Sequence, residues 1–408
     1  MTIRPADADP VHSYQIITTL GVLQILAWGS SFYLLSVLAP AISNDMSWPQ
    51  TFVFGGLSVA LLVAGGASPR IGHTIQRLGG RPVLAASSLL FAGSLALLAA
   101  APNLPVYYAA WAIMGLAMAS GLYDPAFATL GRLYGHAARQ MITAITLFGG
   151  LASTVCWPLS AWLLAQYGWR ATALVYAGLH VIIGLPAYLL LLPKRPPDVV
   201  PQPPAGSSQT SELPVHRQKV AFVLLGAILT TGAVVLSLVS AHLLTLLQAR
   251  GVPLAAAVAL GALVGPSQIT ARVAEMVIGR HFHPVWTMLV GATLFATGIL
   301  LLWADVPMTA LALIAYGAGN GISSIVRGTV PLVLFGPSRY AILMGRLGLP
   351  SLLGMAAAPI IGALLIKTGG ASLTFAVLSG ISLLSLGLGI TLVWWCKSHD
   401  KNHDKAGD

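Results

Sequence analysis

The chain has 408 residues, of which 56% are hydrophobic and only 8% are charged. A soluble domain carries about 25% charged residues, so this composition excludes a soluble enzyme or binding module and indicates an integral membrane protein. The formal net charge of +10 does not point to nucleic acid, because the basic residues stand one to three at a time between apolar runs. That distribution is typical of membrane topology.

The sequence contains no pattern for a bound metal, cofactor or catalytic centre. Cys156 and Cys396 both lie inside apolar runs and give neither a disulfide framework nor metal-ligand spacing. A zinc-protease helix, a phosphate loop and a nucleophile elbow are all lacking from the sequence. We therefore expect no cofactor, no metal, no enzymatic activity and no nucleic-acid partner.

Twelve apolar runs are long enough to cross a bilayer, whose hydrocarbon core of about 30 Å needs roughly 20 helical residues. Their length predicts helices, since barrel strands would show short alternating segments. The predicted fold class is an all-α membrane protein with twelve transmembrane helices. The spans are placed near residues 15–40, 51–70, 82–101, 105–130, 141–164, 171–193, 220–247, 254–279, 284–303, 307–334, 341–366 and 371–396.

A polar stretch from Pro193 to Lys219 divides the apolar sequence into two nearly equal blocks. It is rich in Pro, Ser, Gln and charged residues, so it cannot bury an apolar face and is expected to be a flexible linker. The predicted organisation is an N-terminal six-helix half (1–193), a cytosolic linker (194–219), a C-terminal six-helix half (220–396) and a cytosolic tail (397–408).

Glycines and prolines in the second block repeat those in the first at a nearly constant offset. The offset is 201 or 200 positions for five pairs: Gly135 and Gly336, Pro158 and Pro359, Gly168 and Gly369, Gly121 and Gly321, Gly65 and Gly265. This pattern indicates an internal duplication. Two pseudo-symmetric halves joined by a linker are a plan typical of secondary transporters.

The distribution of basic residues predicts the orientation of the chain. With the N-terminus inside, fifteen Lys and Arg residues fall in cytosolic segments, and only Arg170, Arg250 and Lys367 fall in outer ones. Because basic residues collect on the cytoplasmic side, both termini are expected in the cytoplasm. The protein is expected to be a multi-pass protein of the cell (plasma or inner) membrane.

The first span carries Gln24, Trp28 and Ser31 among its apolar residues. Their helical spacing places them toward one face of the helix. They either line a polar cavity or hydrogen bond to a neighbouring helix. The sequence leaves both interpretations open.

The connection between the second and third spans reads Gly72-His73-Thr74-Ile75-Gln76-Arg77-Leu78-Gly79-Gly80-Arg81. Its glycines permit a tight turn, and its arginines can cap helix C-termini or reach carboxylates. It resembles the loop signature of the major facilitator superfamily, Gly-x-x-x-Asp-Arg-x-Gly-Arg-Arg. Four positions match: Gly72, Arg77, Gly79 and Arg81. Gln76 replaces the family's acid, and Gly80 replaces the first arginine of the closing pair.

The resemblance covers the whole chain and implies a transporter that works by alternating access. In this superfamily the first, fourth, seventh and tenth helices line a central cavity between the two halves. Asp124, in the fourth span, lies eight residues before Arg132, so about 12 Å from the cytosolic end. The resemblance implies that Asp124 pairs with Arg77 or Arg81 in a cytosolic gate; direct substrate or proton binding is the alternative.

Other short features resemble the monocarboxylate-porter branch and its bacterial relatives: Trp48, Ser68-Pro69 and Gly168-Trp169-Arg170. In the eighth span, Gln268-Ile269-Thr270-Ala271-Arg272 resembles that branch's Asp-x-x-x-Arg. The resemblance implies that Arg272 holds the substrate carboxylate, with Gln268 in place of the acid. The branch's first-helix lysine has no counterpart here, so its mode of proton coupling is not implied.

Arg272 also stands out from the residues alone. It lies seven residues from the end of an apolar helix, roughly 10 Å deep, and Glu275 at i+3 shares its face. Either the two form a structural ion pair, or anion binding and protonation of Glu275 compete for the same guanidinium.

The tenth span carries Asn320, Ser323 and Arg327 at i, i+3 and i+7, which is one stripe of a helix. This stripe is a candidate wall of the central cavity. His180 and His242 are expected to be hydrogen-bonded packing residues rather than proton carriers.

These observations predict a secondary transporter for a small organic anion, most simply a monocarboxylate. Without an ATP-binding motif its energy must come from an ion gradient or from exchange, with a proton as the expected coupling ion, as a symporter or an antiporter. Glu275 and Asp124 are the proton-coupling candidates. The alternative is a drug or arsenite (metalloid) efflux transporter of the same superfamily. The expected partners are the substrate and the lipid bilayer, and no oligomer is required.

Overall fold

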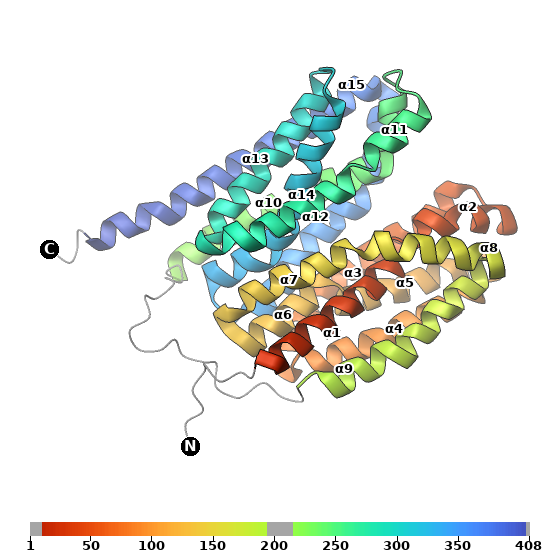
Figure 1. Cartoon of the computed structure of the whole chain (residues 1–408), viewed down its shortest axis with the longest axis horizontal. Helices are drawn as coiled ribbons and strands as arrows, with labels where there is room; N and C mark the ends of the chain where they lie inside the picture. Colours follow the sequence, from red (N-terminus) through yellow and green to blue (C-terminus); the bar gives the residue numbers. More distant parts are fainter. Residues whose placement is uncertain (1–9, 194–214, 405–408) are drawn as a thin grey trace. The chain divides into compact units, whose positions relative to one another are not determined.

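The computed structural model describes residues 10–193 and 215–404 (Figure 1). These residues form helices and their connections, and no β-strand occurs among them. The prediction of an all-α protein is therefore confirmed. Residues 194–214, which make up most of the predicted linker, lie outside the described part of the chain.

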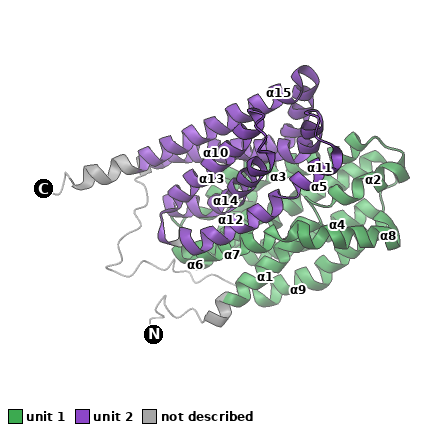
Figure 2. Cartoon of the chain, turned by 45° about the horizontal axis from the view of Figure 1, so that its top comes forward, with its two compact units in different colours: residues 1–208, 336–349 green, residues 209–335, 350–408 purple. Residues whose placement is uncertain are grey.

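The chain divides into two compact units, shown in Figure 2. Unit 1 comprises residues 1–208 and 336–349, and unit 2 comprises residues 209–335 and 350–408. The helix that follows the tenth expected span therefore begins in unit 1 and continues in unit 2. The predicted halves place residues 336–349 in the C-terminal half, whereas their contacts group them with unit 1.

Unit 1 contains the first eleven helical elements. They are α1 (Pro10–Gly29), α2 (Leu35–Met46), α3 (Gln50–Leu78), α4 (Gly80–Ala99), α5 (Leu104–Gly121), α6 (Tyr123–Tyr134), the 3-10 turn η1 (Gly135–Ala137), α7 (Ala138–Gly150), α8 (Ala152–Leu179), the π-helical turn η2 (His180–Gly184) and α9 (Leu185–Leu191). Within this unit α3 and α4 pack on α5, and α1 packs on α7 and α8 (Figure 1).

The remaining elements belong to unit 2, apart from the first residues of α15. They are α10 (Val215–Gln248), α11 (Leu254–Gly261), α12 (Val264–Ile278), the 3-10 turn η3 (Gly279–His281), α13 (Pro284–Trp303), α14 (Thr309–Phe335) and α15 (Tyr340–Asp404). Within this unit α12 and α13 both pack on α14.

Every expected span falls on helix, although several spans are joined. By length and apolar composition, eight helical stretches of the described chain can cross a membrane. Three expected spans fall in the stretch Leu104–Leu191 and two in Tyr340–Cys396, while the first overlaps the shorter apolar helix Tyr14–Gly29 and extends beyond it. The joined stretches bend where the backbone leaves the helical region, at Gly168 (φ 79°) and Gly370 (φ 65°). Both angles favour glycine, which has no Cβ to clash.

Several spans expected as single helices are interrupted, among them the first and the fourth. The first is broken between α1 and α2, where Tyr33 N bonds back to Trp28 O across five residues. The fourth is broken at Leu122 (ψ −159°), between α5 and α6. Pro125 explains this break. In a continuous helix the Pro125 ring would clash with the carbonyl group of Gly121, four residues earlier, and Pro125 has no backbone N–H to donate to that carbonyl oxygen.

The duplication is visible in the backbone. α6 ends at Tyr134 and is followed by Gly135 at φ 56°, and α14 ends at Phe335 and is followed by Gly336 at φ 70°. These two glycines are one of the pairs related by the constant offset. A glycine with positive φ therefore follows the last helix of both the fourth and the tenth expected spans.

Candidate functional site

Arg272, on α12, is buried, with 5% of its surface exposed. Its Nε donates to the carbonyl oxygen of Gly321 on α14 (3.3 Å), and its Nη2 donates to Gln268 Oε1 one turn earlier on α12 (3.4 Å). Two neutral oxygens thus help to orient the guanidinium. The structure thus brings Arg272 and Gln268 into contact.

Glycines on α14 allow this approach. A Cβ at Gly317 would lie 2.1 Å from Ser267 Oγ, and a Cβ at Gly321 would lie 2.5 Å from the carbonyl oxygen of Gln268. These distances are far inside van der Waals contact, so α12 and α14 pack backbone to backbone. Small residues at i and i+4 are the usual means of such packing in membranes. The Gly321 carbonyl is thereby within reach of Arg272.

Glu275 is half-buried near the end of α12. Its Oε1 accepts a hydrogen bond from Thr287 Oγ1 on α13 (2.9 Å). Its carboxylate also lies over Gly279, where an added Cβ would come within 2.0 Å of it. Glu275 therefore has a polar anchor on α13, and its competition with an anion for Arg272 stays a prediction.

The stripe predicted on the tenth span lies on α14, and its members are half-buried. Asn320 directly precedes Gly321, the acceptor for Arg272, while Ser323 Oγ donates to Gly319 O (2.8 Å) within its own helix. Arg327 lies two turns beyond Asn320. Asn320 and Arg327 stay predicted substrate contacts.

The buried His180 and the half-buried His242 both make hydrogen bonds. His180 Nε2 lies 2.8 Å from Ser30 Oγ, and its ring stacks on Phe91 with centroids 4.6 Å apart. His242 Nε2 lies 2.8 Å from the carbonyl oxygen of Pro359. These contacts agree with the expectation that His180 and His242 are packing residues.

In unit 1, Gln24 is fully buried on α1 and lies at the break in the fourth span. Its Nε2 donates to Gly121 O at 2.8 Å. This is the carbonyl that Pro125 leaves without a helical partner. Trp28, one turn further along α1, packs its ring on Tyr123 with centroids 5.0 Å apart. Ser31, just beyond the end of α1, donates from Oγ to Ala27 O.

The signature loop forms the turn between α3 and α4. Gly79 has φ 85°, which requires glycine. Arg81 Nη2 donates to Leu189 O in the last turn of α9, and Arg132 Nη1 donates to Ile75 O near the end of α3 (3.2 Å). Both arginines therefore cap helix C-termini, where a positive charge is stabilising. Between them lies a cavity of about 10 Å³, enough for one water molecule.

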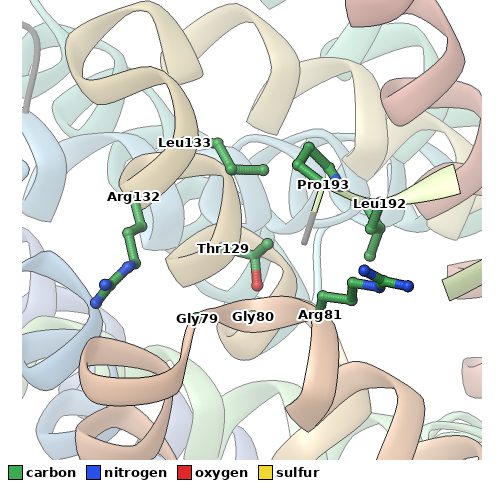
Figure 3. A pocket seen from close by; sticks show the side chains of 8 residues that line it. All are labelled: Gly79, Gly80, Arg81, Thr129, Arg132, Leu133, Leu192 and Pro193. Carbon is green, nitrogen blue, oxygen red and sulfur yellow. The ribbon is translucent and has the colours of Figure 1, made fainter. Parts of the chain in front are cut away.

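Figure 3 shows that Arg81 and Arg132 extend in opposite directions from this cavity. Besides the two arginines it is lined by Gly79, Gly80, Thr129, Leu133, Leu192 and Pro193. The two guanidinium groups do not converge on a common point, so the cavity is a packing gap rather than an anion site.

Residues 336–349 contribute contacts on α3 that the sequence did not indicate. Gln76, which replaces the family's acid, donates from Nε2 to Ser338 O (3.0 Å). Gly72 and Gly345 face each other so closely that a Cβ at Gly72 would lie 3.2 Å from the Gly345 Cα. A Cβ at Gly348 would lie 3.0 Å from Asp124 Oδ2 and 3.1 Å from Ser68 Oγ.

Asp124 is therefore close to Gly348 and Ser68. Arg77 is exposed on α3, and the contact of Arg81 is with α9. The pairing of Asp124 with Arg77 or Arg81 stays a prediction.

The Gly168-Trp169-Arg170 motif forms a polar cluster with Asp45, at the end of α2. Trp169 Nε1 donates to Asp45 Oδ2 (3.0 Å), and Arg170 Nη1 pairs with the same oxygen. The hydrogen bond from Trp169, and next that from Arg170, holds the pKa of Asp45 below its ordinary value. The kink at Gly168 turns Trp169 and Arg170 toward α2. The motif can be recognised in the sequence, but its partner Asp45 cannot.

The chain has two similar halves, and its long apolar helices carry polar and charged side chains. These features are typical of a multi-pass membrane transporter. A sequence profile of the Major Facilitator Superfamily matches residues 20–282. The chain therefore belongs to the major facilitator superfamily, as the signature loop predicted, and is a transporter rather than an enzyme.

Relatives and solved structures agree with this assignment. The chain is 28% identical over 351 residues to "Monocarboxylate transporter 13" of Rattus norvegicus, covering 82% of this chain and 78% of the relative. The human organic anion transporter MFSD10 (TETRAN) has a similar structure, with a TM-score of 0.72 and 19% identity over 92% of this chain and 99% of the other. The E. coli fucose:proton symporter FucP has a TM-score of 0.67 and 14% identity, over 92% and 98%. These two structures support the fold alone.

Proposed function

We propose that this protein carries a small organic anion of the monocarboxylate type across the cell (plasma or inner) membrane by alternating access, and that Arg272 holds the carboxylate. The observation that carries the proposal is the buried guanidinium of Arg272, whose Nε and Nη2 are held by neutral oxygens. A planar guanidinium matches a carboxylate with two parallel hydrogen bonds. The similarity to a monocarboxylate transporter along most of both chains supports the same substrate class.

Gln268 is the proposed partner of Arg272 in holding the anion. Its Oε1 accepts from Arg272, so its amide nitrogen is the end available to donate to a carboxylate oxygen. Because a neutral glutamine replaces an acid at this position, no carboxylate on residue 268 competes with the substrate. Asn320 and Arg327 are proposed as further polar contacts on α14.

The energy is proposed to come from a proton gradient or from exchange, with Glu275 and Asp124 as the coupling groups. Thr287 donates to the Glu275 carboxylate. Both termini are proposed to be cytoplasmic, because most Lys and Arg residues then fall in cytosolic segments. The halves are proposed as residues 1–193 and 220–396, joined by the linker 194–219. The tail 397–408 follows the second half.

The test is uptake by the purified full-length protein in proteoliposomes. Labelled acetate, lactate and benzoate are offered with and without a proton gradient, beside labelled arsenite and the cationic dye ethidium. We expect at least one carboxylate to accumulate and the gradient to increase its rate, while arsenite and ethidium stay at the level of empty vesicles. Transport of arsenite or ethidium with no carboxylate transport would establish the efflux alternative instead.

A further inference from the structure

A groove of about 440 Å³ lies between α2 and α8 in unit 1. Its volume is in the usual range of small-molecule sites. The groove is lined by two residues of α2 and five of α8: Ser36, Val37, Ser153, Thr154, Trp157, Pro158 and Ala161. None of these lining residues is charged or a histidine. The groove is therefore a neutral site built from unit 1 alone.

The internal duplication provides a reference for this groove. The offset of 201 positions relates α2 and the first part of α8 to segments of α10 and α15 in unit 2. There Ser237, the counterpart of Ser36, donates from Oγ to the carbonyl oxygen of Met355 at 2.8 Å. Met355 is the counterpart of Thr154. In unit 2 a direct hydrogen bond thus joins the two helices, and Ser237 is buried.

A proline makes the carbonyl oxygen available in each unit. Pro158 follows Thr154 by four residues, and Pro359 stands at the equivalent position of unit 2; neither has the N–H that a helix would offer to that oxygen. Ser237 supplies the missing donor in unit 2. Its counterpart Ser36 is exposed, and the Ser36 hydroxyl makes no hydrogen bond within the described part of the chain. The Thr154 carbonyl oxygen therefore lacks the side-chain partner that its counterpart has.

Side-chain size explains why the two units differ. In unit 2 a stripe of small residues lies on α15 at four-residue spacing: Gly354, Ala358 and Gly362. A Cβ at either glycine would come within 2.8 Å of a side chain on α10, so the two helices pack tightly there. The equivalent positions of α8 carry larger side chains: Ser153, Trp157 and Ala161. These side chains hold α8 away from α2, and a groove opens at the place where unit 2 is closed.

The groups along the groove define the chemistry of its occupant. In a membrane an unpaired hydroxyl is costly, so Ser36 favours a ligand that can hydrogen bond. A hydroxyl group is donor and acceptor through a single oxygen, and can bridge Ser36 Oγ and Thr154 O. Beside them the Trp157 ring is 45% exposed, and Tyr33 meets it edge-on with centroids 6.0 Å apart. An exposed indole favours a second aromatic ring.

We propose that this groove binds a small neutral aromatic alcohol, in the simplest case a phenol. The ligand's hydroxyl oxygen accepts a hydrogen bond from Ser36 Oγ, and its proton is donated to Thr154 O. This completes through the ligand the link that Ser237 makes directly in unit 2. The aromatic ring packs on Trp157. The site goes beyond the proposed transport of carboxylates and does not depend on it.

The test is equilibrium dialysis of radiolabelled phenol against the purified full-length protein in lipid nanodiscs. Empty nanodiscs correct for phenol that dissolves in the lipid. We expect saturable binding at one site per chain. Unlabelled fluorobenzene has the shape of phenol but no hydroxyl, so it should compete roughly tenfold more weakly than unlabelled phenol, because it leaves Ser36 Oγ and Thr154 O unpaired.

Two variants test the groove, and a third is the matched control. Ser36→Ala removes the donor and keeps the groove, so phenol affinity should fall roughly three- to tenfold. Ala161→Leu places a larger side chain at an exposed lining position and should abolish the saturable binding. Ser237→Ala makes the same change as Ser36→Ala at the counterpart in unit 2, where the hydroxyl is already paired, so phenol binding should equal that of the wild type.

Phenol binding to the wild type that does not exceed binding to empty nanodiscs would overturn the proposal; a groove filled by water or by a lipid chain would give that result. Saturable binding that survives unchanged in both Ser36→Ala and Ala161→Leu would also overturn it, because the phenol would then lie elsewhere. If Ala161→Leu does not fold, Ser36→Ala beside Ser237→Ala decides alone. Carboxylate uptake is measured separately, so either proposal can fail while the other stands.

Discussion

The packing of α12 on α14 makes a quantitative prediction for Gly321→Ala. The new Cβ would lie 2.5 Å from the Gln268 carbonyl oxygen and 2.8 Å from its Cα, whereas ordinary van der Waals contact begins at 3.4 Å. Both neighbours are backbone atoms and cannot rotate away, so the helices must separate by about 0.9 Å. The Arg272 Nε to Gly321 O bond, now 3.3 Å, would then exceed 4 Å and be lost.

Two measurable effects follow. Overpacking of this kind costs typically about 1–3 kcal/mol of stability, so the melting temperature of the purified protein should fall. A hydrogen bond that involves a charged group contributes about 1.5–3 kcal/mol, so an anion that depends on a well-oriented Arg272 should bind roughly tenfold more weakly or worse. The assay is thermal unfolding in detergent together with titration of the carboxylate that the reconstituted protein transports fastest.

Gly265→Ala is the matched control, because Gly265 lies on α12 itself and a Cβ there meets nothing within 4 Å. Its melting temperature and anion affinity should equal those of the wild type. If Gly321→Ala binds the anion as tightly as Gly265→Ala does, the Gly321 carbonyl does not position Arg272, and the account of this site is wrong.

Three further predictions concern the carboxylates. Asp124→Asn should slow turnover more than it weakens binding, as measured by transport rate, affinity and the labelling of cysteines at both mouths; lost affinity with unchanged labelling would place Asp124 in the binding site. Glu275→Gln should tighten anion binding and flatten its pH dependence, and an unchanged pH profile would refute its role in coupling. Asp45 has a pKa below its ordinary value, so its pair with Arg170 stabilises the protein at neutral pH and fails as acid protonates it. Wild-type melting temperature should therefore fall more than that of Asp45→Asn as the pH drops below the ordinary range of an aspartate, about 4, and parallel curves would contradict this.

The helical spans could be predicted because their length and apolarity are local properties of the sequence. The interruption of the fourth span could also have been found, since Pro125 forbids the helical bond to Gly121 O. The capture of that carbonyl by Gln24 could not, because it depends on how closely α1 approaches the break. The sequence left open whether Gln24 lines a polar cavity or hydrogen bonds to a neighbouring helix. The hydrogen bond from Gln24 to Gly121 O shows that the contact with a neighbouring helix exists.

The candidate site was predictable in its residues but not in its partners. Arg272 stood out because a cation within an apolar run needs a reason, and Gln268 was singled out by the resemblance to the monocarboxylate-porter branch. The acceptor Gly321 O is 49 positions away and became available only because glycines let α14 touch α12. The contacts of residues 338–348 with α3 and α6 were likewise unpredictable, since no local pattern in 336–349 indicates which helix it will meet.

The most direct test of the central claim compares Arg272→Gln and Arg272→Lys in the carboxylate uptake assay. Glutamine removes the charge and the two-bond fork, so we expect a roughly 10- to 100-fold loss of anion affinity. Lysine restores the charge but not the fork, so its affinity should be intermediate. Carboxylate transport at the wild-type rate and affinity by a well-folded Arg272→Gln protein would contradict the claim that Arg272 holds the substrate.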